Sequence, residues 1–304
     1  MNKMTRRSFI ETTATFAAAS SLPLSSILAP KEKPIGVQLW SVREDMTEDP
    51  DKTLKALARD GFNYVECFSN PPENQGYVKG KVFGKSVMEF KKMLKEYELK
   101  MPSGHVGFSS KDYDATKKDI SDEWKKNIED ALKLGQRYII CPWMQEYDRK
   151  TPDDVKKFSD ALNVAGQYCQ TQSIRLGYHN HWFEFDKLGD DLIYTTLLKN
   201  TTPELVAFEM DLCWAVSKNQ DPVEWFKNYP GRFELVHLKD LDQEDNKKTV
   251  IFGQGKVDFP NILDNIRKGG VRYLIVELEN YEKSPIEDLK VCYKNAHKLI
   301  RELK

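Results

Sequence analysis

The chain has 304 residues, of which 40% are hydrophobic and 31% are charged, a composition typical of a folded globular protein. Its 46 basic and 47 acidic residues leave a formal net charge of -1, which argues against the basic surface of a nucleic-acid-binding protein. The five cysteines are scattered without a paired spacing, which argues against a disulfide framework and against a structural zinc site.

The first 30 residues are predicted to be an export signal. Arg6 and Arg7 lie in a segment, TRRSFI, that resembles the twin-arginine export motif, and a weakly apolar stretch rich in Ala, Ser and Thr follows it. Pro23 and the polar residues of that stretch argue against a membrane-spanning helix, so no stable membrane anchor is expected. The sequence therefore predicts an exported, periplasmic protein whose residues 31–304 form one domain.

From residue 34 onward, short apolar runs alternate with amphipathic stretches of helical length. The predicted strands cover residues 35–42, 64–68, 100–106, 137–143, 175–181, 205–214, 233–240 and 273–280. The predicted helices cover residues 51–59, 86–97, 121–134, 152–171, 192–199, 222–228, 260–268 and 286–303. Gly61 fits a helix end, and Thr151 followed by Pro152 fits a helix start.

This strand-then-helix rhythm predicts an α/β fold, a single (β/α)8 TIM barrel. An open doubly wound sheet is the alternative, but no glycine-rich phosphate loop follows the first predicted strand. The longest loop-like stretch, residues 69–85, follows the second strand. At that position a lid over the active site and a plain surface insertion are both open interpretations.

Acidic and histidine residues gather at the predicted strand ends, where barrels of this kind place their functional groups. Side chains two apart on a strand share a face, so His179 and His181 are expected to point into the barrel together. Asp211, His237 and Glu277 lie at the ends of the following strands. Imidazole and carboxylate groups together suit one divalent ion, Mn²⁺, Zn²⁺, Co²⁺, Fe²⁺ or Mg²⁺, and burying the carboxylates without a cation would be costly.

For any one of these histidines, a hydrogen-bonded packing role is the more common one, and only the joint pattern on neighbouring strands favours a metal site. Glu66, His105 and Glu184 are candidates for contacts with the substrate or with the ligands. Glu209 is interpreted as a buried structural carboxylate, paired with Lys239 or with an arginine.

The chain resembles the xylose-isomerase-like sugar phosphate isomerase/epimerase superfamily, which includes inosose dehydratases and AP endonucleases of the second family. The matching segments are GVQLWSV (36–42), YHNHWFEF (178–185), EMDLCW (209–214), HLKD (237–240), GQG (253–255) with DF (258–259), and IVE (275–277). The resemblance implies one divalent metal held by Glu, Asp, His and Glu from strands five to eight. The last three ligands fall on Asp211, His237 and Glu277, whereas the strand-five position aligns best with His179, with His181 and Glu184 as the other candidates.

By this resemblance the chain is expected to remove a proton next to the carbonyl of a keto-sugar with the help of the metal. His181 and Glu66 are the candidate bases, and Lys239 would stabilise the developing oxyanion or bind a substrate oxygen. The residues expected to bind the sugar are Trp40, His105, Glu184 and Trp214. Trp143 and Trp182 also lie near strand ends, where stacking on a sugar face and core packing are equal alternatives.

Three functions remain open at this point. The first is an isomerase or epimerase acting on a keto-sugar, and the second is a lyase or hydratase acting on 3-keto-glycosides or inosose-like substrates. The third is a non-catalytic periplasmic sugar-binding protein. Export favours free sugars over sugar phosphates, and the turn 253–255 is interpreted as a tight turn ahead of a helix capped by Asp258. The expected partner is a small carbohydrate, and barrels of this class often form homodimers.

Overall fold

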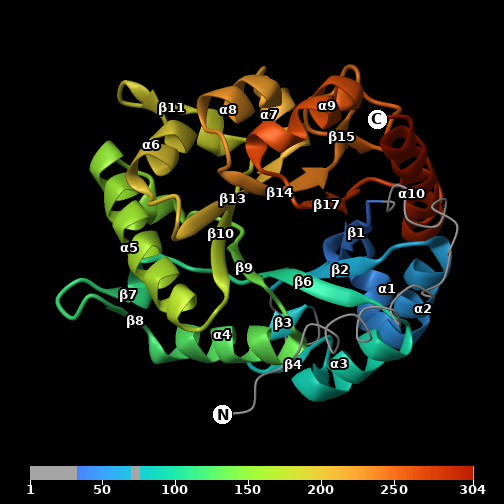
Figure 1. The fold of residues 1–304 in the computed structure, drawn as a ribbon, viewed down its shortest axis with the longest axis horizontal. Helices are drawn as coiled ribbons and strands as arrows, with labels where there is room; N and C mark the ends of the chain where they lie inside the picture. Colours follow the sequence, from blue (N-terminus) through green and yellow to red (C-terminus); the bar gives the residue numbers. More distant parts are fainter. Residues whose placement is uncertain (1–32, 70–75, 304) are drawn as a thin grey trace, which may run out of the picture. The chain divides into compact units, whose positions relative to one another are not determined.

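The computed structural model describes residues 33–69 and 76–303, so the export signal predicted for residues 1–30 lies outside the described residues. Eight parallel strands close into a barrel, and helices surround it (Figure 1). In chain order around the ring they are β1 (Ile35–Gln38), β2 (Tyr64–Cys67), β6 (Lys100–His105), β9 (Tyr138–Cys141), β10 (Arg175–His179), β13 (Val206–Asp211), β14 (Phe233–Leu238) and β17 (Tyr273–Val276). Because β17 pairs with β1, the predicted closed barrel is confirmed.

All eight predicted helices are present, and two short helices, α1 and α7, are additional. The helices are α1 (Arg43–Glu48), α2 (Pro50–Asp60), α3 (Val87–Glu96), α4 (Asp122–Leu134), α5 (Pro152–Thr171), α6 (Ile193–Asn200), α7 (Leu212–Ser217), α8 (Pro222–Asn228), α9 (Phe259–Gly269) and α10 (Pro285–Glu302). The predicted caps are confirmed: Gly61 ends α2 with a left-handed φ of 112°, and the Thr151 side chain accepts from the backbone N–H of Asp154. Within the described residues, no helix is long and apolar enough to cross a membrane.

All eight barrel strands end one to four residues earlier than predicted, and a helical turn follows β1 and β13 at once. β1 ends at Gln38 and β10 at His179, while β13 ends at Asp211, whose Oδ1 accepts from the Trp214 N–H at 3.2 Å and so begins α7. Apolar residues continue past these strand ends into the loops, so the hydrophobic pattern alone made the strands too long. His181 therefore lies beyond β10, and strand alternation does not determine where it points.

The barrel interior is filled differently at its two ends. At the N-terminal end, Tyr273 packs edge to face against Tyr64 and Tyr138, with ring centroids 5.5 and 5.7 Å apart. The Tyr138 hydroxyl donates to Glu234 at 2.6 Å, and Arg175 Nε lies 2.7 Å from the other oxygen of the same carboxylate. Histidines and carboxylates fill the C-terminal end instead. The three tyrosines therefore close the N-terminal end of the barrel interior.

Short antiparallel ribbons project from the loops that follow the barrel strands. They comprise β3 (Tyr77–Val78), β4 (Lys81–Val82) and β5 (Lys85–Ser86), then β7 (Tyr113–Asp114) with β8 (Asp119–Ile120), β11 (Lys187–Leu188) with β12 (Asp191–Leu192), and β15 (Asp240–Leu241) with β16 (Thr249–Val250). The Tyr77 hydroxyl bonds to Asn127 and Asp130 of α4, at 3.0 and 3.1 Å. Residues 76–85 thus pack on an outer helix as a surface insertion, and residues 70–75 lie outside the described part.

Candidate metal centre and active site

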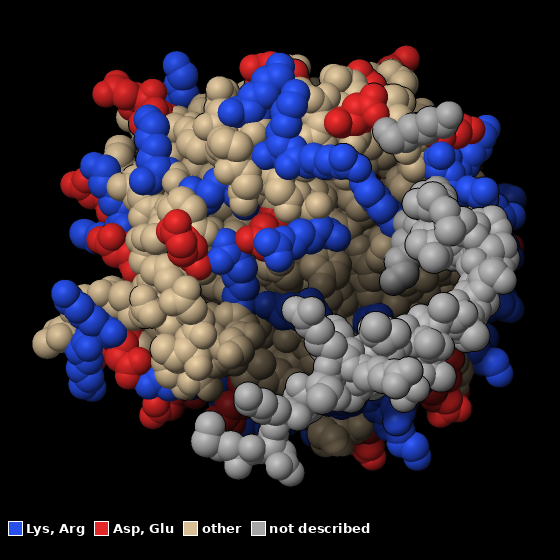
Figure 2. Space-filling view, viewed as in Figure 1, with Lys and Arg blue, Asp and Glu red and all other residues tan. Residues whose placement is uncertain are grey.

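A cavity of about 330 Å³ opens at the C-terminal ends of the barrel strands. Figure 2 shows the barrel face of Figure 1 hollowed at its centre, with charged residues of both signs around the hollow. The cavity is lined by Gln38, Trp40, Phe68, Ser69, His105, Pro142, Trp143, His179, His181, Trp182, Trp214, Lys239, Glu277 and Glu279. Residues far apart in the sequence meet here because all eight strands end at this face.

The upper cluster consists of Asp211, His237 and Glu277, all buried, each with one ligand atom within 4.8 Å of the others. His237 Nδ1 lies 2.8 Å from Glu277 Oε2. Asp211 Oδ2 is buried and accepts no hydrogen bond from any described residue, and His179 Nε2 lies 4.0 Å from it. Two carboxylates and two imidazoles form a donor set that suits a divalent transition ion, and the unsatisfied oxygen leaves room for a metal bond. These residues therefore fit one divalent ion.

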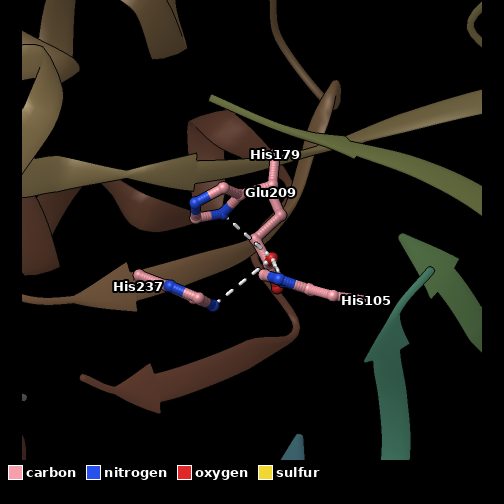
Figure 3. Close-up of side chains that lie close together, drawn as sticks. All are labelled: His105, His179, Glu209 and His237. Carbon is pink, nitrogen blue, oxygen red and sulfur yellow. Dashed lines mark hydrogen bonds and ion pairs between the residues drawn. The ribbon is translucent and has the colours of Figure 1, made fainter. Parts of the chain in front are cut away.

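The lower cluster lies deeper and consists of His105, His179, Glu209 and His237. Figure 3 shows the three imidazole rings converging on the Glu209 carboxylate. Glu209 Oε2 lies 2.7 Å from His105 Nε2, 3.1 Å from His179 Nδ1 and 3.3 Å from His237 Nε2. One buried carboxylate oxygen thus faces a nitrogen of each ring, and His179 and His237 each present their second nitrogen to the upper cluster.

Glu66 contacts two of these histidines, His105 and His237, from the opposite side of the barrel. Its Oε1 lies 2.8 Å from His237 Nε2 and 3.1 Å from His105 Nε2, and it accepts a hydrogen bond from the Gln38 amide at 2.8 Å. Glu66 is fully buried and does not line the cavity among the described residues. It was predicted as a candidate base; in the structure it lies beneath the imidazoles and is not among the residues that line the cavity.

Lys239 follows β14 and brings a positive charge to the wall of the cavity. Its Nζ lies 3.4 Å from Asp211 Oδ2 and 3.2 Å from Glu277 Oε2, and it also contacts Glu279. The ammonium group stands 4.7 Å from the centre of the Trp214 ring, within cation–π range. Lys239 therefore contacts both carboxylates of the upper cluster and also faces the cavity.

The histidines differ in charge because their surroundings differ. Burial alone would lower the pKa of His237, but Glu209 and Glu277 on either side raise it well above its usual range. Burial holds the pKa of His179 well below its usual range, and Glu209 offsets this only in part. Without a bound ion, the protonated form of His237 is therefore favoured, whereas His179 favours the neutral form. Burial also raises the pKa of Asp211 to about 6, against the opposing charge of Lys239.

His181 lies on the aromatic wall of the cavity, held by its own loop. Its backbone N–H donates to Glu184 Oε2 at 2.9 Å, and the Tyr178 hydroxyl donates to the other oxygen of Glu184 at 2.6 Å. Trp143 packs edge to face on the His181 ring at 4.8 Å, and Nδ1 of His181 finds no hydrogen-bond partner among the described residues. The His181 ring therefore lines the cavity, while its Nδ1 is buried and unpaired.

The structure brings most of the predicted site residues to this cavity. The predicted residues that line it are Trp40, His105, His179, His181, Trp214, Lys239 and Glu277. Asp211 and His237 lie directly beneath, whereas Glu66 and Glu184 are buried behind the lining. Glu184, predicted to bind substrate, instead supports the loop that carries His181.

Glu209 has different partners from those predicted. It was expected to pair with Lys239 or with an arginine, but it contacts three histidines, and Lys239 pairs with Asp211, Glu277 and Glu279. Alternation along a strand predicts which side chains point into the barrel, but not how far along the barrel axis each one lies. The partners of Glu209 depend on that depth. Gln38 was missed, although it ends the first strand as the other candidates end theirs.

Comparisons with known proteins agree with this architecture. The family model described as "Xylose isomerase-like TIM barrel" matches residues 54–302. The chain is similar to a solved sugar phosphate isomerase/epimerase from Parabacteroides distasonis, with 30% identity, a TM-score of 0.75, and coverage of 93% of this chain and 97% of that one. It also resembles the IolI protein, solved with a bound zinc atom, at 15% identity and a TM-score of 0.68 over 89% of this chain and 99% of that one. At that identity the likeness shows the shared fold.

Among curated proteins, the chain is similar to the inosose dehydratase of Geobacillus kaustophilus, with 25% identity over 185 residues. That match covers 55% of this chain and 58% of the relative. An inosose dehydratase of Bacillus cereus (strain AH820) is 31% identical over 98 residues, 31% of each protein. The chain therefore matches these relatives over little more than half of their length or less.

Proposed function

Because the chain belongs to the xylose isomerase-like TIM barrel family, we propose that it is a divalent-metal-dependent enzyme that removes a proton next to the carbonyl of a keto-sugar. The proposal rests on one observation: Asp211, His237 and Glu277 lie with His179 at the floor of the cavity, and a buried oxygen of Asp211 has no described hydrogen-bond partner. These four residues would hold the ion, with Mn²⁺, Zn²⁺, Co²⁺, Fe²⁺ and Mg²⁺ as the candidates.

An ion held there would act as a Lewis acid, polarising the carbonyl and offsetting the negative charge that develops when the neighbouring proton leaves. His181 is the candidate base, because its ring lines the cavity beside the ligand His179, with 5.1 Å between the ring centroids. Lys239 would donate to a substrate oxygen from the opposite wall, with its charge already balanced by neighbouring carboxylates. His181 would accept the proton, and Lys239 and the ion would stabilise the negative charge that develops on the substrate oxygen.

The sugar would stack on the aromatic wall. Four tryptophans line the cavity, and Trp182 and Trp214 pack edge to face at 5.1 Å beside His181. Such rings bind the apolar faces of sugars and exclude water from the reacting carbon. A free keto-sugar or a keto-glycoside is the proposed substrate class.

A phosphate group lacks an obvious site in the turn 253–255. Asp240 Oδ2 accepts from the backbone N–H groups of Gly253 and Gly255, at 2.8 and 2.9 Å, so these amides are already used. Asp258 begins α9 by accepting from the Asn261 N–H, as the sequence predicted. This turn therefore offers no free amides to a phosphate group, and the preference for an unphosphorylated substrate rests on the proposed export to the periplasm.

The same first step serves two reactions. Returning the proton to the sugar gives isomerisation or epimerisation, the first proposal. Loss of a β-substituent gives a lyase, the second proposal, which is supported by the partial similarity to proteins named inosose dehydratase. The substrate class separates them, because only a substrate with a leaving group β to the carbonyl can eliminate.

The test is hydrogen exchange in D₂O with a panel of keto-sugars and 3-keto-glycosides, followed by NMR. We expect deuterium at the carbon next to the carbonyl, and its loss after chelation and in Asp211→Ala. The product then distinguishes an isomerase from a lyase. If the metal-loaded protein binds a sugar of the panel but exchanges no proton, it is a sugar-binding protein and the proposed enzyme function is wrong.

A further inference from the structure

The upper and lower clusters share His237, and His179 lies between them. His237 directs Nδ1 to Glu277 in the upper cluster and Nε2 to Glu66 and Glu209 below. His179 directs Nε2 toward Asp211 and Nδ1 toward Glu209. A neutral imidazole has one lone pair and one N–H, so neither ring can bind an ion in each cluster.

We infer that the lower cluster is not a second metal site, and that Glu66 and Glu209 are positioning residues that turn His237 and His179 toward a single ion in the upper cluster. The inference rests on the proposed metal centre and adds to it the residues that set its ligand geometry. Glu66 and Glu209 have no contact with the cavity among the described residues, so they act through the histidines.

For His237, carboxylates face both ring nitrogens, so an ion bound beside Glu277 would leave the proton on Nε2, where the lower contacts accept it. Glu66 Oε1 at 2.8 Å and Glu209 Oε2 at 3.3 Å are acceptors, and both side chains are fully buried. Nδ1 is then the atom that gives its lone pair to an ion beside Glu277, which lies 2.8 Å away. A carboxylate that accepts from the non-ligating N–H fixes both the tautomer and the ring orientation of a metal-bound histidine.

For His179, the distances from its two ring nitrogens to Glu209 and Asp211 likewise assign one nitrogen to the proton and the other to the ion. Nδ1 lies 3.1 Å from Glu209 Oε2, a hydrogen-bond distance, so the proton of the neutral ring is on this side. Nε2 lies 4.0 Å from Asp211 Oδ2, too far for a hydrogen bond. That spacing is within the reach of one ion bonded to both atoms, since metal–nitrogen and metal–oxygen bonds are each about 2.0–2.2 Å.

His105 and Gln38 hold the two carboxylates in place. His105 Nε2 lies between Glu209 Oε2 at 2.7 Å and Glu66 Oε1 at 3.1 Å, and the Gln38 amide donates to Glu66 at 2.8 Å. The His105 and His237 rings are nearly parallel, with centroids 5.5 Å apart. Since these groups are buried and bonded to one another, the orientation of both ligand histidines is fixed before an ion binds.

The test compares Glu209→Gln and Glu66→Gln with a matched control, Glu234→Gln, which neutralises a buried carboxylate at the other end of the barrel. Metal-free protein is titrated with Zn²⁺ in competition with a chelator, and with Co²⁺ while its visible ligand-field spectrum is recorded. We expect one ion per chain, a 10- to 100-fold loss of affinity in each of the first two variants, an altered Co²⁺ spectrum, and no change in either property in Glu234→Gln. Folding of each variant is checked by circular dichroism, and the two variants provide independent tests.

Each other result overturns the inference in a distinct way. Affinities within threefold of wild type would show that the two carboxylates do not position the ligands. Weaker binding with an unchanged Co²⁺ spectrum would show that the carboxylates attract the ion by their charge and do not set the geometry of its ligands. Two ions per wild-type chain, with one lost in Glu209→Gln, would make the lower cluster a second metal site. Wild-type protein that binds no ion would overturn the proposed metal centre itself.

Discussion

The two ends of the barrel interior both bury carboxylates, but only one end satisfies them. At the N-terminal end, Glu234 contacts the Tyr138 hydroxyl at 2.6 Å and the Nε atoms of Arg175 and Arg272 at 2.7 and 3.4 Å. At the C-terminal end, three buried carboxylate oxygens have no hydrogen-bond partner among residues 33–69 and 76–303: Glu66 Oε2, Glu209 Oε1 and Asp211 Oδ2.

The difference separates a structural use of buried charge from a functional one. A buried carboxylate that is fully paired contributes to stability, whereas an unpaired one costs free energy and persists where a ligand completes it. Asp211 Oδ2, in the upper cluster beneath the cavity, accepts no hydrogen bond from a described residue and is ion-paired with Lys239 at 3.4 Å. No oxygen of Glu234 is among the buried atoms without a hydrogen bond in the described part of the chain. The predictions below test whether substitutions at the two ends have these different effects.

The largest effect is expected from Asp211→Asn, which neutralises the carboxylate whose Oδ2 accepts no hydrogen bond from a described residue. Divalent-metal affinity should fall more than 100-fold, because a ligand contributes more than the groups that orient it, and proton exchange should disappear. Asp211→Asn keeps the shape of the side chain and its cap on α7. Metal binding measured by chelator competition checks this, and an affinity within threefold of wild type would contradict the assignment.

Glu184 should make the stability of the metal-free protein depend on pH. Burial raises its pKa from the ordinary 4.5 to about 7, partly offset by the hydrogen bond from Tyr178. The folded protein therefore holds a proton that the unfolded chain releases, so stability falls as pH rises from about 4.5 to about 7. A difference of that size corresponds to at most about 3 kcal/mol.

Glu184→Gln should remove this part of the pH dependence. Urea unfolding of both proteins at pH values across that window measures the difference between them. The wild type should lose stability relative to the variant as pH rises, and parallel curves would show that Glu184 does not titrate in this range.

Glu234→Gln should lower stability without affecting the metal. Loss of the charge that accepts a hydrogen bond from Tyr138 and forms an ion pair with Arg175 should cost about 1–3 kcal/mol of unfolding free energy. Urea unfolding and a zinc titration of the same protein measure both quantities. A parallel loss of metal affinity would show that the two ends are coupled and would break the comparison.

The fold and the position of the site follow from the sequence, but the contacts within the site do not. Apolar runs and helix caps such as Thr151 predict the barrel, and the rule that strand ends carry function identifies His237 and Glu277. The partners of Glu209 were predicted wrongly, because alternation along a strand gives the face of a residue and not its depth. His105 and Glu209 are 104 residues apart, and only the closed barrel brings them to 2.7 Å.

The smallest effect is expected at the open edge of the aromatic wall. Trp182 is 40% exposed and packs on Trp214 beside His181. Trp182→Ala should raise KM by about 2- to 10-fold, as expected for loss of one stacking contact worth about 0.5–1.5 kcal/mol, with little change in kcat. A steady-state assay on the substrate found by NMR measures this, and an unchanged KM would place the sugar elsewhere in the cavity.

The most direct test of the metal centre is an anomalous-scattering map from crystals of the protein loaded with Zn²⁺ or Mn²⁺. The account predicts one strong peak within bonding distance of Asp211, His237, Glu277 and His179, with Glu66 and Glu209 outside bonding distance. A barrel without a peak at the upper cluster, or with its ion bound between Glu66 and His105, would contradict the account.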